Sequence, residues 1–376
     1  MLTGVHLSLL IGPGVPMPAP AVVTNALDAV QVTNSTTSNG FQLTFKIGKT
    51  SELQTAMLPA GYFDPITTRV IVIATVNGMP NVLIDGIVTR QEISPSNEPG
   101  KSTLTITGED LSVLMNLVEM PFMRFPGMPV IAQVYAILAK YTVLGIVPLA
   151  IPPIIPDIPN PLDEIPTQVG TDLEYVRSLA SDCGYVFFIE PGPLPGASIA
   201  YFGPDLRIPL PQPALSVNMD AETNVDSLSF SLDGMSKKLT ILTIMDPITK
   251  AIPIPIPVPN ISILRPPLGA RLTLPSRVEF PSGMAKLSPS AAANRGLAML
   301  LGSTTEMITG SGSLDVTRYG SVLRSRMLVG VRGAGLAYDG LYYVNSVTHN
   351  LKRGEYKQSF NLSRDGLVST TPAVPV

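Results

Sequence analysis

Apolar and polar residues alternate along several segments of the chain, which is the pattern of strands that bury one face. Residues 41–47 and 227–232 alternate in this way, and residues 104–107 form a further short strand pattern. Residues 70–76 are a continuous β-branched run that ends at Asn77-Gly78. An Asn-Gly pair between apolar runs predicts a β-hairpin. We therefore expect a mainly β fold.

Helical spacing of apolar residues occurs in three segments, 130–141, 172–183 and 290–301. The middle segment has the clearest ends. Thr171 and the glutamate three residues after it predict a capping box, and Gly184 supplies the C-terminal stop. We expect few helices, with this one the best defined.

Proline is unusually frequent and clustered, with 38 residues where about half that number is typical. The clusters cover residues 13–20, 148–166, 204–213 and 247–267. Within the last cluster, residues 252–259 alternate isoleucine or valine with proline. Because proline has no backbone N–H to donate, we expect no regular ladder of backbone hydrogen bonds in this segment. We predict either a rigid surface connector or an apolar arm along a neighbouring subunit.

A weak internal repeat links the two ends of the chain. Residues 88–110 and 347–366 are each predicted to form a strand, a turn and a second strand. Each segment ends in a short stretch that contains an acidic residue and a glycine. In this alignment Val88 corresponds to Val347. The repeat predicts two similar small β-barrels, one in each half.

Charged residues make up only 14% of the chain, against about 25% in typical proteins. The mean hydropathy is nevertheless positive. Such a balance predicts large apolar surfaces that are buried between proteins. A net charge of −3 does not favour a nucleic-acid partner.

Membrane insertion is not expected either. The longest apolar stretch, residues 142–156, is shorter than the ~20 residues of a spanning helix and contains four prolines. The first basic residue is Lys46, so no secretory signal is expected.

The chain offers little catalytic chemistry. His6 and His349 are the two imidazoles, and Cys183 is the single thiol, placed on the predicted buried stripe of its helix. No metal-ligand spacing and no Gly-x-Ser-x-Gly motif occurs. We expect no metal, no cofactor and no catalytic residue.

Three close carboxylate pairs keep a hydrolase open as the alternative. They are Asp163-Glu164, Asp220 with Glu222, and Glu109-Asp110. A carboxylate pair could cleave peptidoglycan, which would make the chain a hydrolase.

The C-terminal segment from Arg318 to Asp365 is basic, with eight basic residues against three acidic ones. This local balance fits either solvated strand faces or a basic rim that meets an acidic partner. The candidate rim residues are Arg318, Arg324, Arg326, Arg332, Lys352, Arg353 and Arg364.

Two longer motifs resemble a known family. Residues 170–187 resemble the helix–strand signature of phage late control protein D, which includes baseplate hubs of contractile tails and the hub part of VgrG-type spikes. Residues 333–349 resemble its closing hairpin, and residues 85–111 the end of its first barrel. The residues that carry the two long motifs are Gly170, Asp172, Leu179, Gly184, Tyr185, Tyr338, Asp339, Gly340, Tyr342, Val344 and His349.

The resemblance implies two tail-tube-like β-barrels with a small α/β insertion, and a homotrimer with pseudo-sixfold symmetry. The expected boundaries are 1–117 for the first barrel, 118–205 for the insertion, 206–368 for the second barrel and 369–376 for a tail. The second barrel would carry a proline-rich insertion at about 246–310.

The implied partners are a hexameric inner tail tube, a trimeric spike protein and other baseplate proteins. The implied role is structural: a hub that adapts a threefold spike to a sixfold tube. The alternative is a tail-associated peptidoglycan hydrolase that uses a carboxylate pair. Because no β-helix pattern precedes Val376, we expect the spike to be a separate protein. Assembly is expected in the bacterial cytoplasm, before the hub becomes part of a virion or contractile injection particle.

Overall fold

The computed structural model describes most of the chain. The described residues are 4–98, 100–153, 162, 165–207, 210–236, 238–245, 253–257, 266–271, 276–279, 296, 299 and 306–371. The helix predicted over 290–301 therefore lies outside them, apart from two positions.

The fold is mainly β, as the alternation predicted, and is dominated by a 13-stranded sheet. Seven of its strands come from the first 110 residues and run in the order β3-β4-β7-β6-β5-β1-β2. We call them the N-terminal half-sheet. Its strands are β1 (Val5–Pro13), β2 (Met17–Pro18), β3 (Leu27–Ser35), β4 (Asn39–Ile47), β5 (Thr68–Val76), β6 (Met79–Ser94) and β7 (Ser102–Asp110).

The other six strands form the C-terminal half-sheet. They run in the order β12-β17-β20-β19, and β18 and β11 follow on from β19. Its strands are β11 (Gln212–Ser216), β12 (Val225–Leu232), β17 (Ile308–Asp315), β18 (Leu328–Arg332), β19 (Gly340–Lys352) and β20 (Glu355–Arg364).

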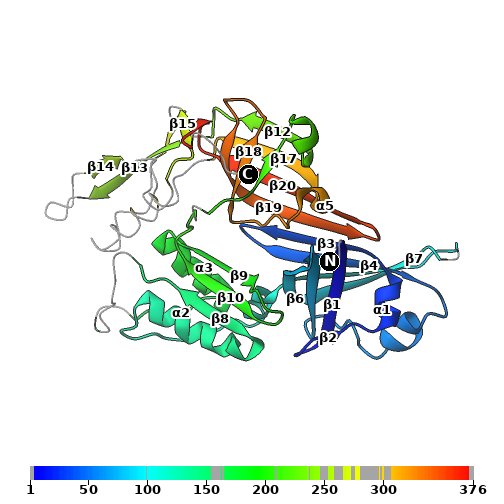
Figure 1. Cartoon of the computed structure of the whole chain (residues 1–376). Coiled ribbons are helices and arrows are strands. Elements are labelled where there is room, and N and C mark those ends of the chain that lie inside the picture. Colours follow the sequence, from blue (N-terminus) through cyan, green and yellow to red (C-terminus); the bar gives the residue numbers. More distant parts are fainter. Residues whose placement is uncertain are drawn as a thin grey trace.

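The two half-sheets join edge to edge, because β19 pairs antiparallel with β3 (Figure 1). The pairing runs from Ser346 opposite Ser35 to Lys352 opposite Ala29. One apolar cluster takes side chains from both half-sheets, including Phe45 from β4 and others from β19 and β20. The two halves are therefore a single packed body.

Both half-sheets contain a β-bulge at an equivalent place, in the β6–β7 and β19–β20 hairpins. The β6–β7 ladder shifts register between Val88 and Arg90. The β19–β20 ladder shifts between Val344 and Ser346. A bulge bends a strand and fixes its register. Val88 therefore corresponds to Val344, and the alignment with Val347 from the sequence was wrong by three residues.

A second pair of bulges gives the same correspondence. The β3–β4 ladder shifts between Leu27 and Ala29, and the β12–β17 ladder between Val225 and Ser227. Each pair of bulges gives its own alignment of β7 with β20. In both alignments the corresponding residues are separated by the same number of positions along the chain. The repeat is therefore consistent across four strands: β3, β4, β7 and β6 correspond to β12, β17, β20 and β19.

An α/β unit lies between the half-sheets in the sequence and packs beside both (Figure 1). It has its own core, in which Val134, Val176 and Phe202 are fully buried. Its elements are α2 (Val130–Leu138), β8 (Ile146–Ala150), α3 (Asp172–Cys183), β9 (Val186–Pro191) and β10 (Ser198–Gly203). The helix predicted over 130–141 is α2 followed by a 3-10 segment, Ala139–Leu144.

The remaining elements are short. They are α1 (Ala21–Ala26), a π-helical turn (Leu53–Met57), two 3-10 turns (Leu111–Asn116, Asp220–Glu222), β13 (Lys238–Met245), β14 (Pro253–Pro257), β15 (Gly269–Arg271), β16 (Arg277–Glu279), α5 (Val316–Tyr319) and β21 (Leu367–Ser369).

The isoleucine–proline repeat forms a strand, contrary to our expectation of a connector without a ladder. β14 pairs antiparallel with β13, with Ile254 opposite Ile244. Alternate residues of a paired strand direct their N–H groups to the partner. The isoleucines can therefore supply every N–H that this ladder needs, while the prolines take the outward positions. The hairpin projects from the body in Figure 1.

Candidate assembly surfaces

The first family motif builds α3 and its connections to α2. Thr171 and Glu174 form the predicted capping box, and Gly184 adopts φ +69° as the C-cap. Asp172 is buried and accepts hydrogen bonds from Tyr141 Oη at 2.7 Å and Gln168 Nε2 at 2.7 Å.

Asp172 also meets a cation. The Lys140 Nζ lies 2.6 Å from its carboxylate. Burial raises the pKa of Asp172, but the hydrogen bonds from Lys140, Gln168 and Tyr141 outweigh burial and hold the pKa below its usual range. This motif residue stabilises the α/β unit.

The other residues of the first motif occupy turn and packing positions in the same α/β unit. Gly170 has φ +80° and leads into the helix. Leu179 and Cys183 are partly buried and pack on the apolar core of the α/β unit. Tyr185 is buried and donates to Pro152 O at 3.0 Å.

The second motif forms the entry to β19. Tyr342 is buried, donates to Tyr338 O at 2.8 Å, and lies under the guanidinium of Arg364 at 4.5 Å. Asp339 Oδ1 accepts from Ala334 N at 2.7 Å. Gly340 adopts φ +123°, and Val344, next along the strand, is fully buried. The structure therefore places the two motifs in different units and gives each a local packing role.

His349 is buried on β19, where its Nδ1 lies within hydrogen-bond distance of two side chains. Its Nδ1 lies 2.8 Å from Tyr356 Oη and 3.1 Å from Gln358 Nε2. Because the glutamine can only donate from that nitrogen, His349 Nδ1 accepts and the imidazole is neutral. Burial, together with the nearby Arg324, lowers the pKa of His349 to about 3. The other histidine, His6, is exposed on β1.

The basic residues do not form one rim. Arg364 is fully buried and donates to the carbonyls of Ala337, Asp339 and Gly366. Arg364 therefore has a structural role, and its inclusion in the predicted basic rim was wrong.

Arg326 is also mostly covered, with a side chain 9% exposed against Phe188 and Glu190. Arg332 is half-buried and Arg324 is exposed. Lys352 and Arg353 stand exposed at the β19–β20 turn, and Arg318 pairs with Asp226 at 3.1 Å.

Polar, uncharged side chains cover part of one face of the large sheet. Thr33, Thr348, Ser359, Ser313 and Ser227 lie directly opposite one another on five successive strands. Several of these neighbours bond through their side chains: the Thr33 and Thr348 hydroxyls are 3.3 Å apart, and those of Ser227 and Ser313 are 2.9 Å apart. Such hydroxyl pairs stabilise a sheet across its strands.

A second row lies beside the first. It comprises Ser35, Ser346, Asn361, Ser311 and Ser229 on the same five strands. We call the two rows together the hydroxyl face. It crosses from one half-sheet to the other through the β19–β3 junction.

An apolar loop follows the first half-sheet. Residues 117–128 expose several large side chains, with Phe122 86% exposed and Val118 59% exposed. The loop is held in place because Met120 N donates to Gly170 O and Phe125 N donates to Pro166 O. A fixed, exposed apolar segment is typical of a protein contact.

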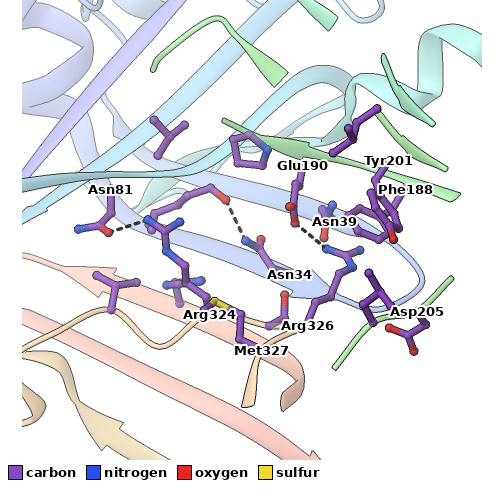
Figure 2. A pocket seen from close by; sticks show the side chains of 18 residues that line it. Asn34, Asn39, Asn81, Phe188, Glu190, Tyr201, Asp205, Arg324, Arg326 and Met327 are labelled. Carbon is purple, nitrogen blue, oxygen red and sulfur yellow. Dashed lines mark hydrogen bonds and ion pairs between the residues drawn. The ribbon is translucent and has the colours of Figure 1, made fainter. Parts of the chain in front are cut away.

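A pocket of about 350 Å³ lies where the two half-sheets and the α/β unit meet (Figure 2). Arg326 lies between Glu190 and Phe188, with its Nη1 3.7 Å from the Glu190 carboxylate. Arg324 donates to Asn81 Oδ1 at 2.9 Å. Burial raises the pKa of Glu190, and the two arginines partly oppose that shift. Arg326 and Arg324 therefore link the segment before β18 to the α/β unit and to the N-terminal half-sheet.

Catalytic features are sparse in the part of the chain that the structure describes. Asp220 and Glu222 lie on an exposed 3-10 turn. Asp110 is buried and accepts from Asn39, whereas its neighbour Glu109 is exposed. Among the described residues, no three His, Cys, Asp or Glu side chains gather to hold a metal ion. Asp163-Glu164 lies outside the described residues.

Comparison with solved structures gives the class of fold. A tail protein from Neisseria meningitidis MC58 matches with a TM-score of 0.63 at 15% identity, over 97% of this chain and 98% of that one. The chain has the fold of this tail protein. The resemblance inferred from the two motifs is thus confirmed at the level of fold.

Two further structures share this tail protein fold. The 43 kDa tail protein of prophage MuSo2 from Shewanella oneidensis matches with a TM-score of 0.60 at 14% identity, over 97% and 100% of the two chains. An E. coli type VI secretion component, described as similar to the T4 tail proteins gp27 and gp5, matches at 0.51 and 12% identity, over 93% and 76%. No protein-family model and no curated protein matches the sequence significantly. None of the helices among the described residues is long and apolar enough to span a bilayer.

The sequence interpretation missed one important contact. Arg69 and Asp85 form a buried ion pair that holds the α/β unit on the N-terminal half-sheet. A signal was present, because each is a single charged residue directly beside an apolar run. A charge in that position is seldom buried unless it is paired.

Proposed function

We propose that this chain is the structural hub of a contractile tail or phage-like injection particle. The observation that carries the proposal is the repeat of two half-sheets, with matching bulges, in one continuous sheet. A chain with two similar units gives six similar units in a trimer, because three copies carry two each. Such a trimer can meet a sixfold tube on one side and a threefold spike on the other.

The surfaces have the properties that this role needs. The apolar loop at 117–128 supplies contact area for neighbouring baseplate or spike proteins. The hydroxyl face offers hydrogen bonds to water without strong attraction for acidic or basic polymers. We infer that this face lines the central channel, where a passenger must slide past without binding.

The role is non-enzymatic in this proposal. The buried polar clusters at Asp172, His349 and Arg364 are each satisfied by groups of this chain, and the Asp220–Glu222 turn is exposed. Their geometry supports packing roles. The family-motif residues would then support the structure of the hub and would not be reactive groups.

Mass photometry tests the proposal. The purified chain would be measured alone and mixed with its candidate spike protein. We expect a species near three times 39.9 kDa, either alone or as a complex with three spike chains. A monomer under both conditions would refute the hub role and leave the fold unaffected.

A further inference from the structure

Two long strand edges have no strand partner in the described part of the chain. The segment of β6 after Val88 pairs with β7 on one edge, while its other edge is free. β12 pairs with β17 on one edge and ends the sheet on the other. Free edges with unpaired N–H and C=O groups are templates for another strand.

The internal repeat says what belongs on these edges. β6 corresponds to β19, and β12 corresponds to β3, by the two sets of bulges. Within the chain, β19 and β3 pair antiparallel at the junction of the half-sheets. The same junction made between two copies would join β6 of one chain to β12 of the next.

The equivalence also fixes the register. Ser346 pairs with Ser35 at the internal junction. Counting from the bulges, the corresponding residues are Arg90 on β6 and Asp233 just after β12. Opposite charges would therefore face each other across the new pair. Three residues further along, Ile93 would face Phe230.

The exposed side chains fit this register. Ile93 and Leu232 are each 41% exposed, although both lie on the side of the sheet that is buried elsewhere. The residue corresponding to Ile93 is His349, which is 1% exposed at the internal junction. Arg90 is 72% exposed and Asp233 is exposed. An added strand would cover the apolar pair and bring the charges together.

We propose that β6 of one chain pairs antiparallel with β12 of a second copy, with Arg90 opposite Asp233 and Ile93 opposite Phe230. The contact is head-to-tail, so each chain offers both edges and the assembly can close into a ring. This inference rests on the proposed hub, and it specifies which surfaces hold the copies together. In the same register Ser94 would lie opposite Ser229 of the hydroxyl face, on the same side of the sheet as Arg90 and Asp233.

Cysteine cross-linking tests the pairing in the full chain. In a Cys183→Ser background, Arg90→Cys and Asp233→Cys are combined and the concentrated protein is mildly oxidised. Directly opposite residues of an antiparallel pair have Cα atoms about 4.5–5.5 Å apart, which suits a disulfide. The matched control combines Arg90→Cys with Leu232→Cys, whose side chains would point to opposite faces.

We expect a non-reducing gel to show covalent dimers and trimers for the 90/233 pair, at least tenfold more than for the 90/232 control. Trimers by mass photometry without selective 90/233 cross-linking would overturn the strand pairing and leave the hub role intact. An absence of oligomers by both methods would overturn the hub role and this inference with it.

Charge reversal gives an independent readout. Arg90→Glu places like charges opposite each other, and we expect association to weaken about fivefold at each junction. The double variant Arg90→Glu with Asp233→Arg restores the pair and should recover the original association. Equal weakening in the single and double variants would contradict the register.

Discussion

The buried ion pair between Arg69 and Asp85 controls how the α/β unit sits on the N-terminal half-sheet. The guanidinium and carboxylate make two parallel hydrogen bonds of 2.7 and 2.6 Å, and their side chains are 6% and 1% exposed. Arg69 also donates to Leu144 O and Gly196 O, and Ser198 donates to Asp85. Three of these five groups belong to the α/β unit or its loops.

Replacing Asp85 with alanine leaves the Arg69 charge buried without its partner. Breaking a buried pair in this way typically costs ~3–5 kcal/mol of unfolding free energy. Replacing both residues, as Arg69→Met with Asp85→Ala, removes the stranded charge but leaves the Leu144 and Gly196 carbonyls without a donor. Each orphaned acceptor costs ~1–3 kcal/mol. The double variant should therefore lose much less than the sum of the two single variants.

The assay is urea denaturation followed by circular dichroism, with hydrogen exchange of β8 and β10 as a local readout. We expect Asp85→Ala to speed exchange in both strands, because the contacts from Arg69 lie just before each of them. Glu98→Ala, which removes an exposed pair with Lys101, is the matched control and should cost at most ~1 kcal/mol. A loss below ~1 kcal/mol for Asp85→Ala, or additive losses in the double variant, would refute this reasoning.

Three further predictions concern single residues. Thr171→Ala removes the α3 cap and should cost ~1 kcal/mol in urea denaturation, where a negligible loss would contradict the capping role. His349 stays neutral in the fold while the unfolded imidazole takes up a proton near pH 6.5, so stability should fall by about 1.4 kcal/mol per pH unit between roughly pH 6 and 3. His349→Gln should flatten that slope, and an unchanged slope would count against it. Gly333→Ala, at φ +84° with a Cβ only 1.9 Å from Val217 O, should lower the melting temperature far more than Gly14→Ala, at φ +68° in open space; equal effects would contradict the steric argument.

Local features of the fold were predictable because their causes are local. The α3 helix follows from Thr171, Glu174 and Gly184, three residues whose preferences act within one or two turns. The β5–β6 hairpin follows from Asn77-Gly78, both of which adopt positive φ. These elements need no partner from elsewhere in the chain to be specified.

Contacts between distant segments were not predictable in the same way. Arg364 looks like a surface cation in the sequence, yet two of the carbonyls that bind it belong to Ala337 and Asp339, on either side of Tyr338. The sequence of β20 around Arg364 does not indicate that contact. The β19–β3 junction likewise joins strands more than 300 residues apart, and alternation alone does not say which edge meets which.

The internal repeat is weak in the sequence because corresponding positions of the two halves hold different residue types. The corresponding positions Leu104 and Gln358 differ in polarity, and Phe45 corresponds to the smaller Leu314. The bulges, however, fall at the same places in both halves. A bulge is set by backbone hydrogen bonding and tolerates many side chains, so it can persist where residue identity does not. What the two halves share is therefore an edge geometry, and an edge geometry that already joins β19 to β3 inside one chain can join β6 to β12 between chains with no new structural element.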